Sequence, residues 1–184
     1  MGQTRAEANR VYRLAVCGVM TAVLCVLAPV AIPAGPVPVT LATLAVYLMA
    51  VLLGWKWGTA GCLAYLAAGL AGMPVFSGYR AGGGMLLGPT GGYLVGYLAI
   101  TLTAGWAAQR SQRRGPLLLG MLTGTALCYA LGTAWYCLQS GTALIPALWA
   151  CVLPFVPFDL VKMAAVLTLG PVLRRRLRQA GLLA

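Results

Sequence analysis

The chain has 184 residues, a length typical of one domain, and 61% of them are hydrophobic while only 8% are charged. Soluble proteins carry about 25% charged residues, so this composition indicates an integral membrane protein. The chain contains 13 basic residues, counting Lys and Arg together, two acidic residues, counting Asp and Glu together, and no His. These counts exclude histidine-based acid–base catalysis, histidine metal sites and hydrolases that use two carboxylates. We therefore expect no catalytic residue, no metal and no cofactor.

The positive charge of the chain is gathered in short clusters. The formal net charge is +11, and the basic residues stand beside apolar runs, where such residues set membrane topology and contact anionic headgroups. We expect the lipid bilayer as a partner, and no nucleic acid. The six cysteines are scattered without a Cys-x-x-Cys pair, which favours buried apolar side chains over a zinc or redox motif.

Six apolar stretches come close to the length of about 20 helical residues that crosses a bilayer. Bounded by proline, glycine or charge, the first five lie at about 11–30, 39–53, 57–72, 91–108 and 116–138. The sixth is interrupted: residues 144–156 contain two prolines, and we expect the helix to restart near Pro157, since proline is favoured in a first turn. The sequence predicts an all-α integral membrane protein, one transmembrane domain over residues 1–184 built as a bundle of six transmembrane helices.

Residues 73–90 differ from the apolar stretches on either side. Five glycines loosen the backbone around an isolated Arg80, and a regular lipid-facing helix is not expected there. We predict a glycine-rich outer loop between the third and fourth helices, folded as a cap or a re-entrant segment.

The short loops carry their positive charge on one side of the predicted bundle. Lys56, the loop 110–114 and the basic tails 1–10 and 174–184 all fall on this side, which is cytoplasmic by the positive-inside rule. The opposite loops carry one basic residue, Arg80. We predict a multi-pass protein of the plasma membrane with both termini in the cytoplasm.

Asp159 and Lys162 are ionisable residues inside the sixth predicted span, where a charge costs roughly 2.5–3.5 kcal/mol on insertion scales. At spacing i, i+3 they share a helix face and can pair. The helix rise places Asp159 about 22 Å outward of Arg174, in the outer half of the membrane. One interpretation is an ion pair that locks the helix to its neighbours. The other, which we prefer because Arg80 lies on the same side, is a polar anchor for a ligand that enters from outside.

Arg80 and the residues after it offer further contacts for such a ligand. A guanidinium binds a carboxylate through two parallel hydrogen bonds, although a solvated loop arginine is the alternative. The run Leu-Gly-Pro-Thr-Gly-Gly-Tyr-Leu at 87–94 starts a helix. There the free N–H groups near Thr90 and Gly91 and the hydroxyl of Tyr93 can bind a polar group, and a simple helix-entry turn is the alternative. No Walker A sequence occurs, so the chain alone does not hydrolyse ATP.

Small residues form a stripe on the first predicted helix. Ala15, Gly18 and Ala22 lie on nearly the same face, a pattern typical of close helix approach. The spacing leaves open whether the partner is another helix of this chain or a separate subunit.

Three segments in this order resemble the BioY family: Gly-Met-Pro-Val-Phe at 72–76 before the glycine-rich stretch, Leu-Gly-Pro-Thr-Gly-Gly-Tyr-Leu-Val-Gly at 87–96, and Pro-Phe-Val-Pro-Phe-Asp-Leu-Val-Lys at 154–162. The resemblance covers nearly the whole chain. It implies a biotin-binding substrate-recognition (S) component of an energy-coupling factor (ECF) transporter. Such a protein has six transmembrane helices, an outward-facing biotin site near the third loop and the sixth helix, and partners in a transmembrane coupling subunit and two cytoplasmic ATPases.

The resemblance also suggests roles for the candidate residues, with biotin as the transported ligand. We expect Asp159 to accept a hydrogen bond from a ureido N–H, and Lys162 and Arg80 to hold a carboxylate or the ureido oxygen. Tyr93, Thr90 and Gly91 would shape the pocket. The stripe on the first helix would be the interface with the coupling subunit.

Three other functions stay open on the sequence alone. One is a proton-coupled or stand-alone carrier of a small carboxylate-bearing vitamin, in which Asp159 would load and release a proton. Another is an intramembrane transferase that uses a cysteine thiol, which lacks a histidine or second carboxylate to activate it. The third is a membrane scaffold without a ligand. We expect the protein not to be an enzyme.

Overall fold

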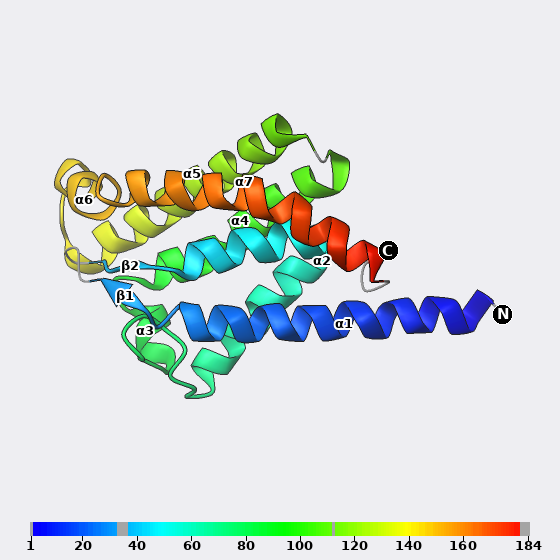
Figure 1. Ribbon diagram of the computed structural model, residues 1–184. Coiled ribbons are helices and arrows are strands. Elements are labelled where there is room, and N and C mark those ends of the chain that lie inside the picture. The colour runs from blue at the N-terminus through cyan, green and yellow to red at the C-terminus, as the bar shows by residue number, and fades with distance from the viewer. Residues whose placement is uncertain (1, 33–36, 112, 181–184) are drawn as a thin grey trace.

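The computed structural model describes residues 2–32, 37–111 and 113–180, and the regular elements in this part of the chain are helices apart from one short hairpin (Figure 1). The long helices run roughly along one direction, with the hairpin, α3 and α6 at one end of the bundle. The elements are α1 (Gly2–Leu27), β1 (Ala31–Ile32), β2 (Val39–Thr40), α2 (Ala42–Leu70), α3 (Gly83–Leu87), α4 (Gly91–Arg110), α5 (Arg114–Ser140), α6 (Leu144–Cys151) and α7 (Phe155–Gln179).

Four of the described helices are long and apolar enough to cross a membrane. They are α1 over Arg10–Leu27, the whole of α2, the whole of α5, and α7 over Phe155–Leu177. The predicted helical membrane fold is therefore confirmed. The count of six spans stays a prediction. Two of the predicted spans are joined in the single helix α2, and α4 is not among the four because its glycines, tyrosines and threonines lower its hydropathy.

Helix α2 reverses its direction at Gly54, where the sequence predicts the boundary between the second and third spans (Figure 1). Gly54 has φ 75° and ψ −176°, a conformation open to glycine and strained for other residues. A Cβ atom at this position would also run into the side chain of Gln109 on α4. The two halves of α2 thus form a hairpin of helices whose turn needs glycine.

A short antiparallel hairpin, absent from the all-α prediction, connects α1 and α2. Its register pairs Ala31 with Thr40 and Ile32 with Val39. The second predicted helix therefore begins at Ala42 instead of Val39, because the β-branched residues Val39 and Thr40 are extended. The Oγ1 of Thr40 accepts a hydrogen bond of 3.2 Å from the backbone N–H of Ala42. This extended start leaves the carbonyl of Thr40 available to α7.

The outer loop, residues 73–90, is folded against the end of α2. The ring of Phe76 is fully buried and meets the ring of Tyr65 edge-on at 5.6 Å between centroids. The hydroxyl of Tyr65 donates to the carbonyl of Val75 at 3.2 Å. The one-turn helix α3 follows and leads into α4. The predicted loop is thus anchored at residues 75–76, while most of its glycines face outward.

Helix α7 starts two residues before the predicted restart and places Pro157 in its first turn. It continues to Gln179, so residues that the sequence assigns to a basic tail extend this helix. The side chain of Arg174 is buried and donates to the carbonyls of Val51 at 3.2 Å and Ala108 at 2.7 Å. These carbonyls lie near the ends of two helical segments, where a positive charge is favourable.

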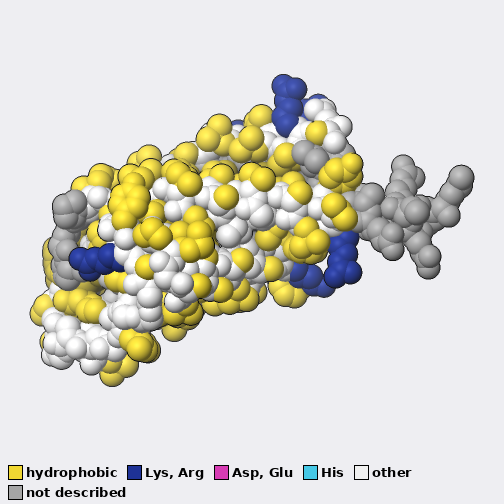
Figure 2. Space-filling view, turned by 90° about the horizontal axis from the view of Figure 1, so that it is seen from below, with side chains coloured by type: hydrophobic (Ala, Val, Ile, Leu, Met, Phe, Trp, Pro, Cys, Tyr) yellow, Lys and Arg dark blue, Asp and Glu magenta, His cyan; other side chains and the backbone are white. Residues whose placement is uncertain are grey.

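Basic side chains gather at the end of the bundle opposite the hairpin (Figure 2). This end holds the reversal of α2 at Gly54, two residues before Lys56, together with the loop between α4 and α5 and the last turns of α7. We call it the basic end. We call the opposite end the hairpin end. Hydrophobic side chains cover much of the surface between the two ends, as expected for a surface that faces lipid.

Candidate functional site

Asp159 and Lys162 form a buried ion pair near the start of α7, at the hairpin end. Their exposed fractions are 3% and 9%, and Lys162 Nζ lies 3.0 Å from Asp159 Oδ1. The predicted pairing at i, i+3 is therefore present. Because both charges are removed from solvent, each needs further polar partners to offset its desolvation.

Residues of the hairpin and of α2 complete the hydrogen bonds of Lys162. Its Nζ donates to the carbonyl of Thr40 at 2.7 Å and to the hydroxyl of Thr43 at 2.9 Å, as well as to Asp159. An ammonium group has three donors, so all three are used. The extended Thr40 described above is what brings its carbonyl to this position.

The carboxylate of Asp159 receives hydroxyl groups from two other helices. Thr43 of α2 donates to Oδ1 at 2.8 Å, and Tyr129 of α5 donates to Oδ2 at 2.6 Å. The short distance from Tyr129 is typical of a charge-assisted hydrogen bond. We call these five residues, Thr40, Thr43, Tyr129, Asp159 and Lys162, the buried cluster. It joins the hairpin, α2, α5 and α7 through polar contacts.

A cavity of about 40 Å³ lies beside the buried cluster. Ligand pockets measure roughly 300–1,000 Å³, so this cavity has room for water and not for a bicyclic ligand. Its walls combine hydroxyls and charges with aromatic rings. They are formed by Val37, Pro38, Thr40, Thr43, Tyr93, Tyr97, Cys128, Tyr129, Phe155, Asp159 and Lys162.

Tyr93 is the third predicted site residue that lines the cavity. Its buried hydroxyl donates to the carbonyl of Cys151 at 3.3 Å, and it lies 3.0 Å from the hydroxyl of Thr133, from which it can then accept. A Cβ atom on Gly132 would collide with the Tyr93 ring. Tyr93 therefore fixes α4 against α5 and the end of α6, and it also lines the cavity.

The other three predicted site residues do not line the cavity. Arg80 is exposed in the outer loop, and its carbonyl accepts a hydrogen bond of 3.0 Å from the N–H of Phe76. Thr90 precedes α4 and uses its carbonyl for the first helical hydrogen bonds. Gly91 is buried against the backbone of Leu86, with which a Cβ atom would collide. In this structure glycine is needed at position 91 because the backbone of Leu86 packs directly against it.

Several residues of the site were not predicted from the sequence. Tyr129 and Thr43 are 30 and 116 residues from Asp159 in the chain, so no spacing rule connects them. Tyrosines within apolar helices could have indicated Tyr129, because a buried tyrosine hydroxyl needs a hydrogen-bond partner. Tyr47 shows the same pattern: it is fully buried, and its hydroxyl lies 2.5 Å from Thr125 Oγ1.

The predicted stripe on α1 faces away from the bundle. Ala15, Gly18 and Ala22 are exposed, and in the part of the chain that the structure describes no atom outside the helix lies within 4 Å of a Cβ built on Gly18. Helix α1 instead packs on α2 through its opposite face, which includes Met20 and Leu24. The sequence left two possible partners for this stripe. Among the described residues, no other helix of the same chain packs against it.

Comparison with known proteins gives concordant results. The model of the BioY family matches residues 3–179. A biotin transporter BioY of Thermotoga maritima is 37% identical over 147 residues, which cover 79% of this chain and 86% of the relative. The biotin transporter BioY2 of Lactococcus lactis is 34% identical over 92% of this chain and 93% of its own length. A crystal structure of the S-component for biotin from an ECF-type ABC transporter superposes with a TM-score of 0.81 at 32% identity, with 92% of each chain covered.

Proposed function

Because the chain belongs to the BioY family, we propose that it binds biotin and mediates biotin uptake as the substrate-specific subunit of an ECF-type transporter. The observation that carries this proposal is the buried cluster. Two charges and three hydroxyl-bearing residues are held together in an apolar bundle that resembles the S-component for biotin. Ionisable groups inside a membrane are costly and mark substrate sites.

The chemistry of the cluster matches the polar groups of biotin. Biotin offers a ureido ring, a carboxylate and an apolar thioether ring with a carbon tail. In this proposal Asp159 accepts a hydrogen bond from a ureido N–H, and Lys162 donates to the ureido oxygen or to the carboxylate. The rings of Tyr93, Tyr97 and Phe155 on the cavity wall supply apolar surface for the thioether ring.

Biotin entry requires the cavity to widen, and we assign this movement to its wall at the hairpin end. Val37 and Pro38 form part of that wall. The outer loop is attached next to it, since the N–H of Gly78 donates to the carbonyl of Pro29 at 3.1 Å. In the same proposal Arg80 binds the biotin carboxylate from the outer loop, while Thr90 and Gly91 provide polar contacts where α4 begins.

The topology proposed with this function has six membrane spans and cytoplasmic termini. The two halves of α2 on either side of Gly54 and the 20-residue helix α4 supply the spans beyond α1, α5 and α7. The basic end then faces the cytoplasm, as the positive-inside rule requires. The partners are a transmembrane coupling subunit, bound at the exposed stripe of Ala15, Gly18 and Ala22 on α1, and two cytoplasmic ATPases.

Uptake of labelled biotin tests this function in cells that lack a biotin transporter of their own. With the coupling subunit and both ATPases present, we expect uptake that is lost when the ATPases are inactivated. Gly18→Leu should lower uptake severalfold by obstructing close helix approach, while biotin binding to the isolated chain stays unchanged. Val26→Leu, at another exposed position of α1, is the matched control and should leave uptake intact.

Two results would contradict the proposal. Uptake that follows the pH gradient without ATPases would indicate a proton-coupled carrier. Full biotin uptake by a variant with Asp159 and Lys162 both replaced by neutral residues would contradict the assignment of the buried cluster as the transport site.

A further inference from the structure

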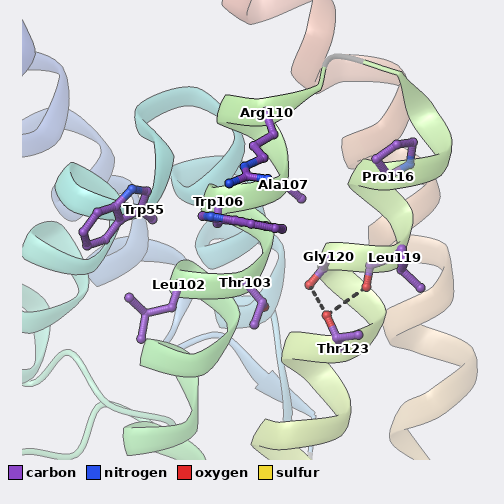
Figure 3. A pocket seen from close by; sticks show the side chains of 10 residues that line it. All are labelled: Trp55, Leu102, Thr103, Trp106, Ala107, Arg110, Pro116, Leu119, Gly120 and Thr123. Atoms are coloured by element: carbon purple, nitrogen blue, oxygen red, sulfur yellow. Dashed lines mark hydrogen bonds between the residues drawn. The ribbon is translucent and has the colours of Figure 1, made fainter.

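A second, larger hollow lies at the basic end, on the outer surface of the bundle between α4 and α5 (Figure 3). This groove has a volume of about 660 Å³. Apolar side chains line most of it, with Trp55 at the turn of α2, Leu102 and Trp106 on α4, and Pro116 and Leu119 on α5. The four residues other than Pro116 have exposed fractions between 37% and 63%, so they face the surroundings of the protein.

The threonine hydroxyls inside the groove already donate their hydrogens within their own helices. The hydroxyl of Thr123 donates to the carbonyls of Leu119 at 2.9 Å and Gly120 at 3.1 Å within α5. Thr103 likewise donates to the carbonyl of Ala99 at 2.9 Å within α4. A ligand in the depth of the groove therefore gains only apolar contacts, and a hydrocarbon chain suits it better than a polar molecule.

Positive charge stands at one end of the groove. The guanidinium of Arg110 lies over the ring of Trp106, 4.4 Å from its centroid, and Lys56 Nζ lies 5.3 Å from the centroid of Trp55. The loop after Arg110 adds the exposed Arg113 and Arg114. The chain has only two acidic residues to oppose these charges. One of them, Asp159, is paired near the opposite end, and among the side chains that the structure describes no carboxylate pairs with Arg110, Arg113 or Arg114.

The length of the groove fits one leaflet of a membrane. Leu102 lies eight residues before Arg110 on α4, which corresponds to about 12 Å along the helix. Half of the hydrocarbon core is about 15 Å thick. A molecule that places a negative group at Arg110 and a hydrocarbon chain along Trp106 and Leu102 would follow the membrane normal. Basic pockets between transmembrane helices bind anionic lipid headgroups in this way.

We propose that this groove is a binding site for one anionic phospholipid, with its phosphate at Arg110 and an acyl chain between α4 and α5. The site is separate from the biotin cavity and lies at the opposite end of the bundle. Because the occupied groove would link the turn of α2 to α4 and α5, the lipid would stabilise the packing of these segments at the basic end.

Quenching of tryptophan fluorescence by bromine-labelled acyl chains tests the proposal, since Trp55 and Trp106 line the groove. The full-length protein is placed in phosphatidylcholine vesicles that contain increasing fractions of brominated phosphatidylglycerol or of brominated phosphatidylcholine. We expect stronger quenching by phosphatidylglycerol at equal fractions. Arg110→Gln should weaken its relative binding about fivefold, the effect of one basic residue near a charged lipid surface. Because both tryptophans line the groove, the double variant Trp55→Phe with Trp106→Phe should remove most of this specific quenching.

Two further variants make the result decisive. Arg10→Gln removes an exposed positive charge of α1 that does not line the groove, and it should leave phosphatidylglycerol binding unchanged. Thr123→Phe places a ring in the groove, and it should abolish the specific quenching even with Arg110 present. Equal quenching by the two lipids, or an unchanged response in Arg110→Gln, would overturn the proposal. Quenching that decreases as protein density rises would contradict it as well, by indicating a second copy of the chain in the groove.

Discussion

The ion pair of Asp159 and Lys162 is stable in an apolar bundle because neighbouring hydroxyls and one carbonyl satisfy both charges. Thr43 serves both partners at once, since its hydroxyl donates to Asp159 and accepts from Lys162. Among the described residues no buried side-chain nitrogen or oxygen is left without a hydrogen bond. Removing one member of such a pair is costly, because the other charge stays buried without its partner.

Replacement of Lys162 by methionine tests this dependence. Lys162→Met keeps the side chain near its size and leaves the Asp159 carboxylate with only Thr43 and Tyr129 as donors. We expect the free energy of unfolding in detergent micelles to fall by about 3–5 kcal/mol. The double variant Asp159→Asn with Lys162→Met removes both charges and should recover much of this loss.

The exposed Lys56 provides the matched control for that measurement. Lys56→Met makes the same chemical change at the basic end, where the side chain reaches solvent, so little change in stability is expected. If Lys162→Met were as stable as Lys56→Met, the ion pair would not stabilise the fold in the way described.

The sequence predicts Asp159 and Lys162 because a charge inside a membrane span is costly, and it predicts Tyr93 because its hydroxyl stands at the glycine-rich start of a helix. The same reasoning does not find Tyr129 or Thr43, whose contribution depends on how α2 and α5 meet α7. The position of Arg80 depends on the path of a glycine-rich loop. Such a path is set by contacts, including those of Phe76 with Tyr65, that the spacing of glycines does not specify.

At the scale of elements, the reversal of α2 at Gly54 depends on a single residue. Its positive φ and its contact with Gln109 both disfavour a side chain. The turn also brings Trp55 to the groove between α4 and α5 and lets the backbone of Trp55 pack on Gly105 of α4. A substitution at Gly54 should therefore disturb the packing of α2 against α4 at the basic end.

Gly54→Ala measures how much this turn depends on glycine. A backbone conformation of this kind costs of the order of 1–3 kcal/mol for other residues, so we expect a loss of this size in the free energy of unfolding. Adding Gln109→Ala should relieve the clash with the side chain but not the backbone strain. Gly115→Ala is the control, because Gly115 is helical and no atom lies within 4 Å of its ideal Cβ. That variant should be neutral or slightly stabilising; an equal loss in both variants would argue against a special role for Gly54.

Most helices were predictable because their apolar stretches end at glycine, proline or charge. The prediction fails where elements are short. The strands β1 and β2 have two residues each, too few to show the alternation of side chains that identifies a strand. Helix α3 has five residues, of which two are glycine, so it could not be distinguished from a loop by sequence.

On the scale of the whole molecule, the two ends of the bundle carry different chemistry. The hairpin end holds the buried cluster and the cavity, while the basic end holds Arg174, the groove between α4 and α5 and most of the positive charge. Arg174 joins the ends of two helical segments through the carbonyls of Val51 and Ala108. The exposed stripe on α1 runs between the two ends. In the proposed function, ligand binding belongs to the hairpin end and coupling to the side of α1.

Calorimetric titration of biotin into the purified protein in detergent, without any partner subunit, tests the central claim most directly. We predict stoichiometric binding to the wild-type chain. For Asp159→Asn we predict binding at least tenfold weaker, since a hydrogen bond to a charged group is worth about 1.5–3 kcal/mol. Thr168→Val, an exposed position on the same helix, should bind biotin normally. Wild-type affinity in an Asp159→Asn protein that is shown to be folded would contradict the assignment of the buried cluster as the biotin site.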